Sequence, residues 1–153
     1  MRHKGFTILE ILIAVSIVTL AVTIIAFSFS KLNSRHALDQ SAALVVAILD
    51  EARSLTLSST GDSQYGVYFE DSRVVLFKGS TYSQSDLSNV VTELNALVGL
   101  RNVTLAGGGT SVVFKRLTGG TDQVGSVEIF LKASPETPRT VSVSATGVSN
   151  VDF

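Results

Sequence analysis

The feature that most constrains this chain is an apolar run near its N-terminus. From Ile11 to Ser30 the sequence contains no charged residue, no proline and no glycine. A helix rises about 1.5 Å per residue, so a helix over this run would be roughly 30 Å long, the hydrocarbon thickness of a bilayer. The sequence therefore predicts a membrane-spanning helix.

One acidic residue, Glu10, directly precedes this run. A carboxylate near hydrocarbon costs about 2.5 to 3.5 kcal/mol on insertion scales, so we expect a positive charge to offset it. A cut after Gly5 would create that charge as the α-amino group of Phe6, one helical turn from Glu10. The partner would lie in the same chain or in a neighbouring chain, and the second arrangement would make the pair an assembly device.

The segment Lys4–Glu10, which reads Lys-Gly-Phe-Thr-Ile-Leu-Glu, together with the apolar run behind it resembles the signal of type IV pilins and type II secretion pseudopilins. The resemblance implies that a prepilin peptidase cuts after Gly5. It also implies that Phe6 becomes the N-methylated mature terminus and that Glu10 guides docking into a filament.

A secretory signal peptide and an ordinary anchor helix are the two other interpretations of the N-terminus. A secretory signal peptide needs small residues at a cleavage site beyond its apolar core, and Phe27-Ser28-Phe29-Ser30 is a poor site of that kind. An ordinary anchor helix would leave Glu10 without a function. Neither interpretation explains the segment as well as the prepilin signal does.

The same resemblance implies partners and a location. The partners are the prepilin peptidase, other pilin or pseudopilin subunits, and an inner-membrane assembly platform. Arg2 and Lys4 place the N-terminus in the cytoplasm by the positive-inside rule. We therefore expect a single-pass protein of the bacterial inner (cytoplasmic) membrane with its C-terminal domain outside the cytoplasm, which later enters a periplasmic or cell-surface filament.

The chain divides into four predicted parts: a leader at 1–5, a transmembrane and filament-core helix at 6–30, an amphipathic continuation at 31–60, and an antiparallel β-domain at 61–153. The continuation carries one apolar stripe at helical spacing, formed by Leu38, Ala42, Val45, Leu49 and Ala52. This stripe should face the chain's own domain. The helix should end near Ser58 or Ser59, with Gly61 as its C-terminal cap.

The segment from Ala42 to Leu49 is apolar on every side of the predicted helix. A helix that packs on one face does not need this. We interpret the extra apolar surface as a contact with neighbouring helices in a bundle. The alternative is that the chain's own domain buries the helix deeply.

After Gly61 the period changes from that of a helix to that of a strand. Tyr65–Phe69 and Arg73–Lys78 predict a hairpin around Glu70-Asp71-Ser72, and the segment Asn89–Val98 is ambiguous between helix and strand, with strand favoured for Val90–Leu94. Further strands are predicted at Asn102–Leu105, Ser111–Leu117, Ser126–Lys132, Arg139–Ala145 and Val148–Phe153. The predicted fold class is α+β, in which the long N-terminal helix packs on an antiparallel sheet or a small β-sandwich.

Three further segments are similar to the GspH/FimT group of minor pilins and pseudopilins. They are Leu49–Leu55, Ser111–Lys115, and Arg139–Val143 followed by Gly147-Val148. This resemblance implies a subunit at or near the filament tip.

The composition argues against catalysis and against metal or cofactor binding. The chain has no cysteine, and of its two histidines His3 would leave with the leader, so neither metal, cofactor nor catalytic residues are predicted. Gly107–Gly109 and Gly119–Gly120 are interpreted as hairpin turns, because neither is followed by the Lys-Ser/Thr and helix of a phosphate loop.

Nucleic acid is not an expected partner. Loss of Arg2 and Lys4 changes the balance to ten basic and thirteen acidic side chains, a net charge of −3. The candidate basic patch consists of Lys115, Arg116, Lys132 and Arg139, and we interpret these as scattered solvated charges.

The sequence thus predicts a structural, non-catalytic subunit, a minor pilin or pseudopilin. The alternatives are a major pilin, a DNA-binding minor pilin for DNA uptake, and a membrane-anchored enzyme for which no site is visible. The sequence leaves open whether the machine serves secretion, motility or DNA uptake.

Overall fold

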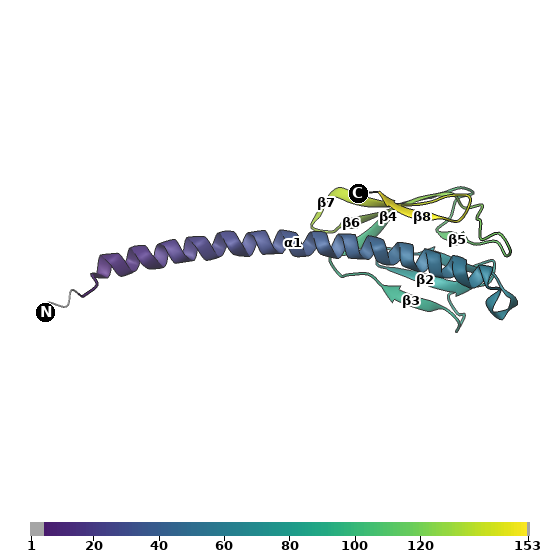
Figure 1. Ribbon diagram of the computed structural model, residues 1–153, viewed down its shortest axis with the longest axis horizontal. Helices are drawn as coiled ribbons and strands as arrows, with labels where there is room; N and C mark the ends of the chain where they lie inside the picture. The colour runs from purple at the N-terminus through teal and green to yellow at the C-terminus, as the bar shows by residue number, and fades with distance from the viewer. Residues whose placement is uncertain (1–4, 153) are drawn as a thin grey trace. The chain divides into compact units, whose positions relative to one another are not determined.

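The computed structural model describes residues 5–152, and the side chains of residues 26–31 are outside this description. Within that range the chain forms a helix, α1 (Ile8–Leu57), a short 3-10 turn, η1 (Thr60–Asp62), and eight strands (Figure 1). It divides between Arg35 and His36 into two compact units.

The first unit contains the part of α1 that precedes His36. Among its described residues, Ile8–Ile25 form a stretch long and apolar enough to cross a membrane. Its large apolar side chains are half to four-fifths exposed, for example Ile8 at 81% and Ile17 at 62%. The structure confirms the predicted apolar N-terminal helix.

In the second unit, α1 packs against the strands through the predicted stripe. Leu38 is 2% exposed, and Ala42, Val45, Leu49 and Ala52 are completely buried. The prediction that this stripe faces the domain is confirmed. The outward side chains Ala43 and Ala47 are exposed, whereas Leu44 and Val46 are partly buried.

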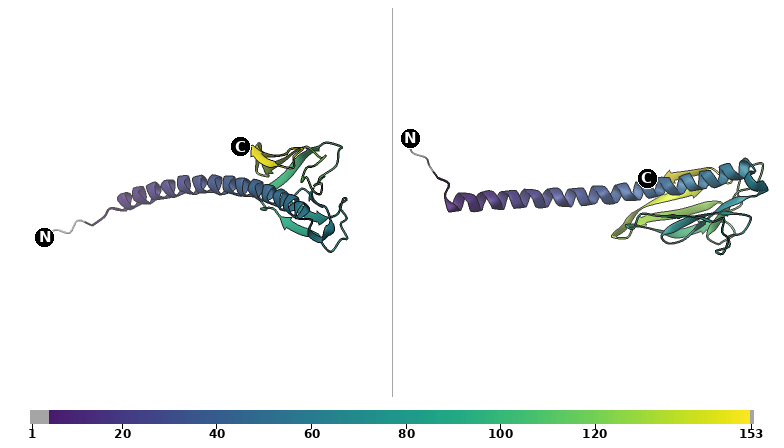
Figure 2. Two further views of the ribbon diagram at one scale, coloured as in Figure 1. Left: turned by 45° about the vertical axis from the view of Figure 1, so that its right-hand side comes forward. Right: turned by 90° about the horizontal axis from the view of Figure 1, so that it is seen from below.

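The strands form two antiparallel four-stranded sheets. The first has the order β3-β2-β1-β5 and the second has the order β4-β6-β7-β8. Their bounds are β1 (Tyr65–Phe69), β2 (Arg73–Lys78), β3 (Val90–Glu93), β4 (Val98–Leu105), β5 (Ser111–Val113), β6 (Gly125–Leu131), β7 (Ser134–Val143) and β8 (Ser149–Asp152). One hydrophobic core joins α1 to both sheets, so the α+β prediction is confirmed (Figure 2).

The predicted hairpin is present, with Tyr65 opposite Lys78 and Phe69 opposite Val74. Within the ambiguous segment, Val90–Glu93 form strand β3, so the favoured strand is confirmed and ends one residue earlier than predicted. Other strand bounds differ from the predictions. β4 begins at Val98 rather than Asn102. β5 ends at Val113 rather than Leu117, which lies in the turn that follows and has a left-handed backbone, with φ 70°.

β7 begins at Ser134 rather than Arg139, although it contains Pro135 and Pro138. Proline cannot donate a ladder hydrogen bond and is therefore confined to edges or bulges. Here β8 pairs only with Thr140–Val143, and the pairing with β6 is irregular between Ile129 and Leu131. The prolines therefore lie where the ladder is incomplete.

Two turn predictions are wrong. Gly107–Gly109 joins β4 to β5, and Gly119–Gly120 lies between β5 and β6, so both segments connect different sheets instead of closing hairpins. Gly107, Gly108 and Gly109 all have positive φ, from 74° to 93°, which glycine adopts without the usual steric cost.

The predicted cap of the helix is also misplaced. The left-handed residue that follows α1 is Ser59, with φ 50°, and its N–H donates to Thr56 O at 3.1 Å. Gly61, with φ 60°, lies two residues later, inside η1. The chain therefore leaves the helix at the serines rather than at the glycine.

Candidate functional site

The candidate site is the start of α1, where the predicted processing and docking residues lie. The helix begins at Ile8, and Oγ1 of Thr7 accepts a hydrogen bond from the Glu10 N–H at 3.2 Å. The Thr7 carbonyl accepts from the Ile11 N–H, also at 3.2 Å. Thr7 is therefore the N-cap of α1.

The sequence analysis missed this cap, although its signal was present. Threonine followed three residues later by glutamate is the spacing of a capping box, in which the threonine oxygen satisfies a free backbone donor of the first turn. The cap fixes where the helix starts. Phe6 consequently lies just before the helix, and Glu10 lies in its first turn.

Glu10 is exposed, and the described part of the chain gives it no ion pair. Its place in the first turn is favourable, because the positive end of the helix dipole stabilises a carboxylate there. This effect typically contributes about 0.3 to 1 kcal/mol, less than the cost of burying the charge in a membrane. A partner from outside the described fold would have to supply the remainder.

No contact in the structure requires a glycine at position 5. A Cβ added at this position would meet no atom within 4 Å. Phe6 beside it is 79% exposed. The glycine and the aromatic residue are therefore accessible and are not explained by packing within this chain.

The polar side chains of the apolar helix are satisfied by the helix itself. The Ser16 hydroxyl donates to Leu12 O at 2.7 Å, Thr19 donates to Val15 O, and Thr23 donates to Thr19 O at 2.8 Å. Bonded in this way, hydroxyls can enter an apolar environment without leaving an unpaired donor. The exposed surface around them is otherwise apolar.

The structure does not bring the four candidate basic residues together. Lys115 pairs with Asp122 at 2.6 Å and Arg116 with Asp62 at 2.5 Å, close to the end of α1. Lys132 donates to Ala96 O at 3.1 Å.

The fourth basic residue, Arg139, pairs with Asp39 on α1 at 2.8 Å. Asp39 precedes the helix end at Leu57 by 18 residues, or about 27 Å of helix. The Arg116–Asp62 pair and the Arg139–Asp39 pair therefore lie at opposite ends of the second unit.

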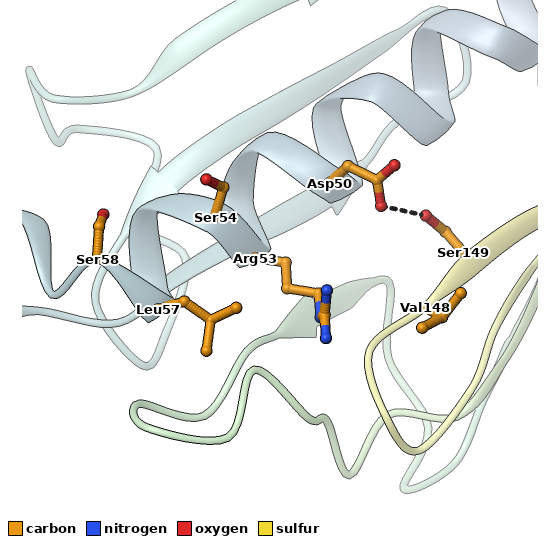
Figure 3. Close-up of a pocket in the computed structure, with 7 residues that line it drawn as sticks. All are labelled: Asp50, Arg53, Ser54, Leu57, Ser58, Val148 and Ser149. Atoms are coloured by element: carbon orange, nitrogen blue, oxygen red, sulfur yellow. Dashed lines mark hydrogen bonds between the residues drawn. The ribbon is translucent and has the colours of Figure 1, made fainter.

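A groove that the sequence analysis did not anticipate lies between the end of α1 and the turn from β7 to β8 (Figure 3). It is lined by Asp50, Arg53, Ser54, Leu57, Ser58, Val148 and Ser149. Among the described residues there is no cluster of three or more metal-ligating side chains. Sequence spacing does not reveal the groove, because its walls are about one hundred residues apart.

Comparisons with known proteins bear on both parts of the chain. Residues 1–26 match the family model of the prokaryotic N-terminal methylation motif. A comparison with curated proteins gives no match.

Among solved structures, the chain is similar to the type IV minor pilin FimU of Pseudomonas aeruginosa, with a TM-score of 0.59 at 16% identity, covering 78% of this chain and 90% of that one. It is also similar to the minor pseudopilin EpsH of the Vibrio cholerae type II secretion system, with a TM-score of 0.57 at 17% identity, covering 75% and 95%.

The motif match confirms the predicted prepilin-type signal, and the structural similarities confirm a fold consistent with the GspH/FimT group. Together they support a subunit of a pilus or secretion filament. The chain therefore carries a prepilin-type N-terminal motif and a fold similar to those of the minor pilin FimU and the minor pseudopilin EpsH.

Proposed function

We propose that this chain is a structural, non-catalytic subunit, a minor pilin or pseudopilin, of a type IV pilus-like or type II secretion filament. It is inserted into the inner membrane as a precursor, cut after Gly5, and assembled through α1. The observation that carries the proposal is the methylation motif at residues 1–26, which includes an exposed apolar helical stretch with one acid in its first turn.

The geometry of the start of α1 supports a cut after Gly5. No contact within this chain requires a glycine at position 5, and recognition by a peptidase would account for it. Because Thr7 caps the helix, the new amino group on Phe6 would stand just outside the first turn, which contains Glu10. The ammonium of one chain can then neutralise Glu10 of the same chain or of a neighbour.

The exposed apolar surface of α1 supports assembly rather than a free soluble state. Each large apolar side chain removed from water contributes about 1.5 to 3 kcal/mol. A bilayer would bury this apolar surface before assembly, and neighbouring helices would bury it afterwards. The exposed Ala43 and Ala47 extend the contact surface into the second unit.

The implied partners are a prepilin peptidase, other pilin or pseudopilin subunits, and an inner-membrane assembly platform. The domain that follows α1 would lie outside the cytoplasm. Whether the subunit is minor or major depends on its copy number, which residues do not determine.

The DNA-binding alternative is less well supported. DNA affinity grows with the number of phosphates that basic side chains neutralise. Arg116 and Arg139 are paired with acids of this chain, and Lys115 is paired with Asp122. Binding a phosphate would require these pairs to be given up.

Processing is tested by intact-mass measurement on the full chain expressed with and without a prepilin peptidase. With the peptidase, the protein should begin at Phe6 and carry one methyl group. A Gly5→Val variant should stay uncut, and because Gly5 contacts nothing, its fold should be unchanged. Retention of residues 1–5 in the presence of active peptidase would overturn the proposal.

A further inference from the structure

Two oppositely charged side chains of α1, Asp50 and Arg53, line the groove but do not pair with each other. Asp50 and Arg53 are three positions apart on the helix, a spacing at which opposite charges commonly meet. Instead, Oδ1 of Asp50 accepts from the Ser149 hydroxyl at 3.0 Å, and Nε of Arg53 donates to Gly119 O at 3.2 Å (Figure 3). The two side chains therefore bond different segments, Asp50 the start of β8 and Arg53 the connection between β5 and β6.

This arrangement leaves the two terminal guanidinium nitrogens of Arg53, its fork, available to bind a ligand. Its two terminal nitrogens make no hydrogen bond or ion pair within residues 5–152, and the side chain is only half-buried. A guanidinium fixed at Nε, with its other nitrogens open, is preorganised to bind a carboxylate through two hydrogen bonds.

Beside Arg53 the groove has an apolar rim. Leu57 is 41% exposed and Val148 is 44% exposed, and both line the groove. A ligand that matches both features carries a carboxylate next to a branched apolar side chain.

The chain presents that combination elsewhere on its surface, in the loop between β2 and β3. Leu87 is fully exposed, at 102%, and follows Asp86 directly. A leucine so completely in water within an ordered loop gains from any apolar partner.

Local hydrogen bonds hold this loop in place. Oδ1 of Asp86 accepts from both the N–H and the hydroxyl of Ser88 at 2.8 Å, and Nδ2 of Asn89 donates to Ser83 O at 2.8 Å. The hydrogen bond from the Ser88 N–H, and after it the one from the Ser88 hydroxyl, lower the pKa of Asp86. Its carboxylate is therefore charged. Oδ2 of Asp86 makes no hydrogen bond or ion pair with the described residues.

We propose that Asp86 and Leu87 of one copy dock into the groove of a second copy, with the Asp86 carboxylate on the Arg53 fork and Leu87 against Leu57 and Val148. The charges and the apolar surfaces are complementary. In the second unit the groove lies beside β8, whereas the loop leads into β3, and these strands lie on opposite sides of α1 (Figure 1).

Because the two surfaces are different patches of the same domain, the contact is heterologous. Such a contact joins two copies head to tail instead of through the same patch on each. The inference deepens the proposed filament role and rests on it for the setting in which copies meet.

Disulfide cross-linking tests the contact, because the chain contains no cysteine of its own. Two full-length chains with different tags, one carrying Ser54→Cys in the groove and the other carrying Ser85→Cys beside Asp86, are co-expressed, and their membranes are oxidised. A disulfide requires the two Cα atoms to come within about 7 Å. The matched control replaces Ser85→Cys with Ser72→Cys, an exposed position in the turn between β1 and β2.

We expect the mixed disulfide for the Ser54 and Ser85 pair and a background yield for the Ser54 and Ser72 pair. Asp86→Asn keeps an oxygen for Ser88 but removes the charge, so it should lower the yield roughly tenfold, as loss of a charge-assisted pair would. Leu87→Ser should lower it as well. Asp50→Asn removes the competing acid from the groove and should leave the yield unchanged or raise it.

Equal yields for the two cysteine pairs, or a yield that Asp86→Asn and Leu87→Ser do not change, would overturn the proposed contact. A chain that is processed and enters filaments without this cross-link would contradict the docking while leaving the filament role intact. A chain that is neither cut nor assembled would instead contradict the proposed function.

Discussion

Nε of Arg139 on β7 donates a hydrogen bond to Oδ1 of Asp39 on α1 at 2.8 Å, across one hundred residues of sequence. The arginine side chain is 22% exposed and the aspartate side chain 41% exposed. This pair and the Asp50–Ser149 bond tie the helix to the second sheet at two levels, outside the apolar core. The alignment of helix and sheet therefore has a polar component as well as an apolar one.

Asp39→Asn should lower the free energy of unfolding by about 0.5 to 1 kcal/mol, because solvent screens a pair that is this exposed. Urea unfolding of the full chain in detergent, followed by circular dichroism, measures the change. Glu51→Gln is the control, since Glu51 is exposed on the same helix and should change stability by less than about 0.5 kcal/mol. Equal effects of the two variants would show that the pair contributes nothing specific.

Leu49→Ala should destabilise the second unit far more, by about 2 to 5 kcal/mol, because it leaves a cavity in the shared core. Leu49 is completely buried, whereas Leu32, also on α1, is 53% exposed. Leu32→Ala is therefore the matched control, and the same unfolding experiment should show almost no change. A small effect of Leu49→Ala would mean that the core collapses around the lost side chain.

Thr7→Ala should fray the first turn of α1 and cost about 0.5 to 2 kcal/mol of local stability, the usual effect of losing an N-cap. Amide hydrogen exchange at Glu10, measured by NMR in micelles, should become faster. Thr7→Ser keeps the accepting oxygen and should exchange as the wild type does. Unchanged exchange in Thr7→Ala would show that the 3.2 Å bond from Glu10 N–H does not support the helix.

The features that sequence could predict are those that local periodicity encodes. The stripe from Leu38 to Ala52 repeats at helical spacing and is buried, and the alternation in Tyr65–Phe69 gave the hairpin correctly. The N-cap at Thr7 was not predicted, although Thr7 and Glu10 have the spacing of a capping box.

What periodicity cannot encode is which distant segments meet. Gly107–Gly109 looks like a hairpin turn until strand pairing shows that it crosses between sheets. Likewise, nothing near Arg53 in the sequence indicates Gly119, which accepts its hydrogen bond, or Val148 and Ser149, which line the groove beside it.

A shortened chain beginning at residue 31 should be soluble and should show both helix and strand by circular dichroism, because the second unit has its own core. On a random DNA duplex this fragment should bind no better than roughly 10⁻⁴ M at physiological salt, the weak end of non-specific affinity. Fluorescence anisotropy measures this. Micromolar binding that disappears when Lys115 and Arg116 are changed to alanine would favour the DNA-uptake alternative.

The central claim, that this chain is a filament subunit docked through Glu10, is tested most directly by its amount in sheared, purified filaments relative to its amount in the membrane. The wild type should be present in the filament fraction in its mature form. Glu10→Ala should insert into the membrane and be cut as the wild type is, because the apolar helix is unchanged, yet it should be lost from the filaments. Glu10→Ala at the wild-type level in sheared filaments would contradict the account.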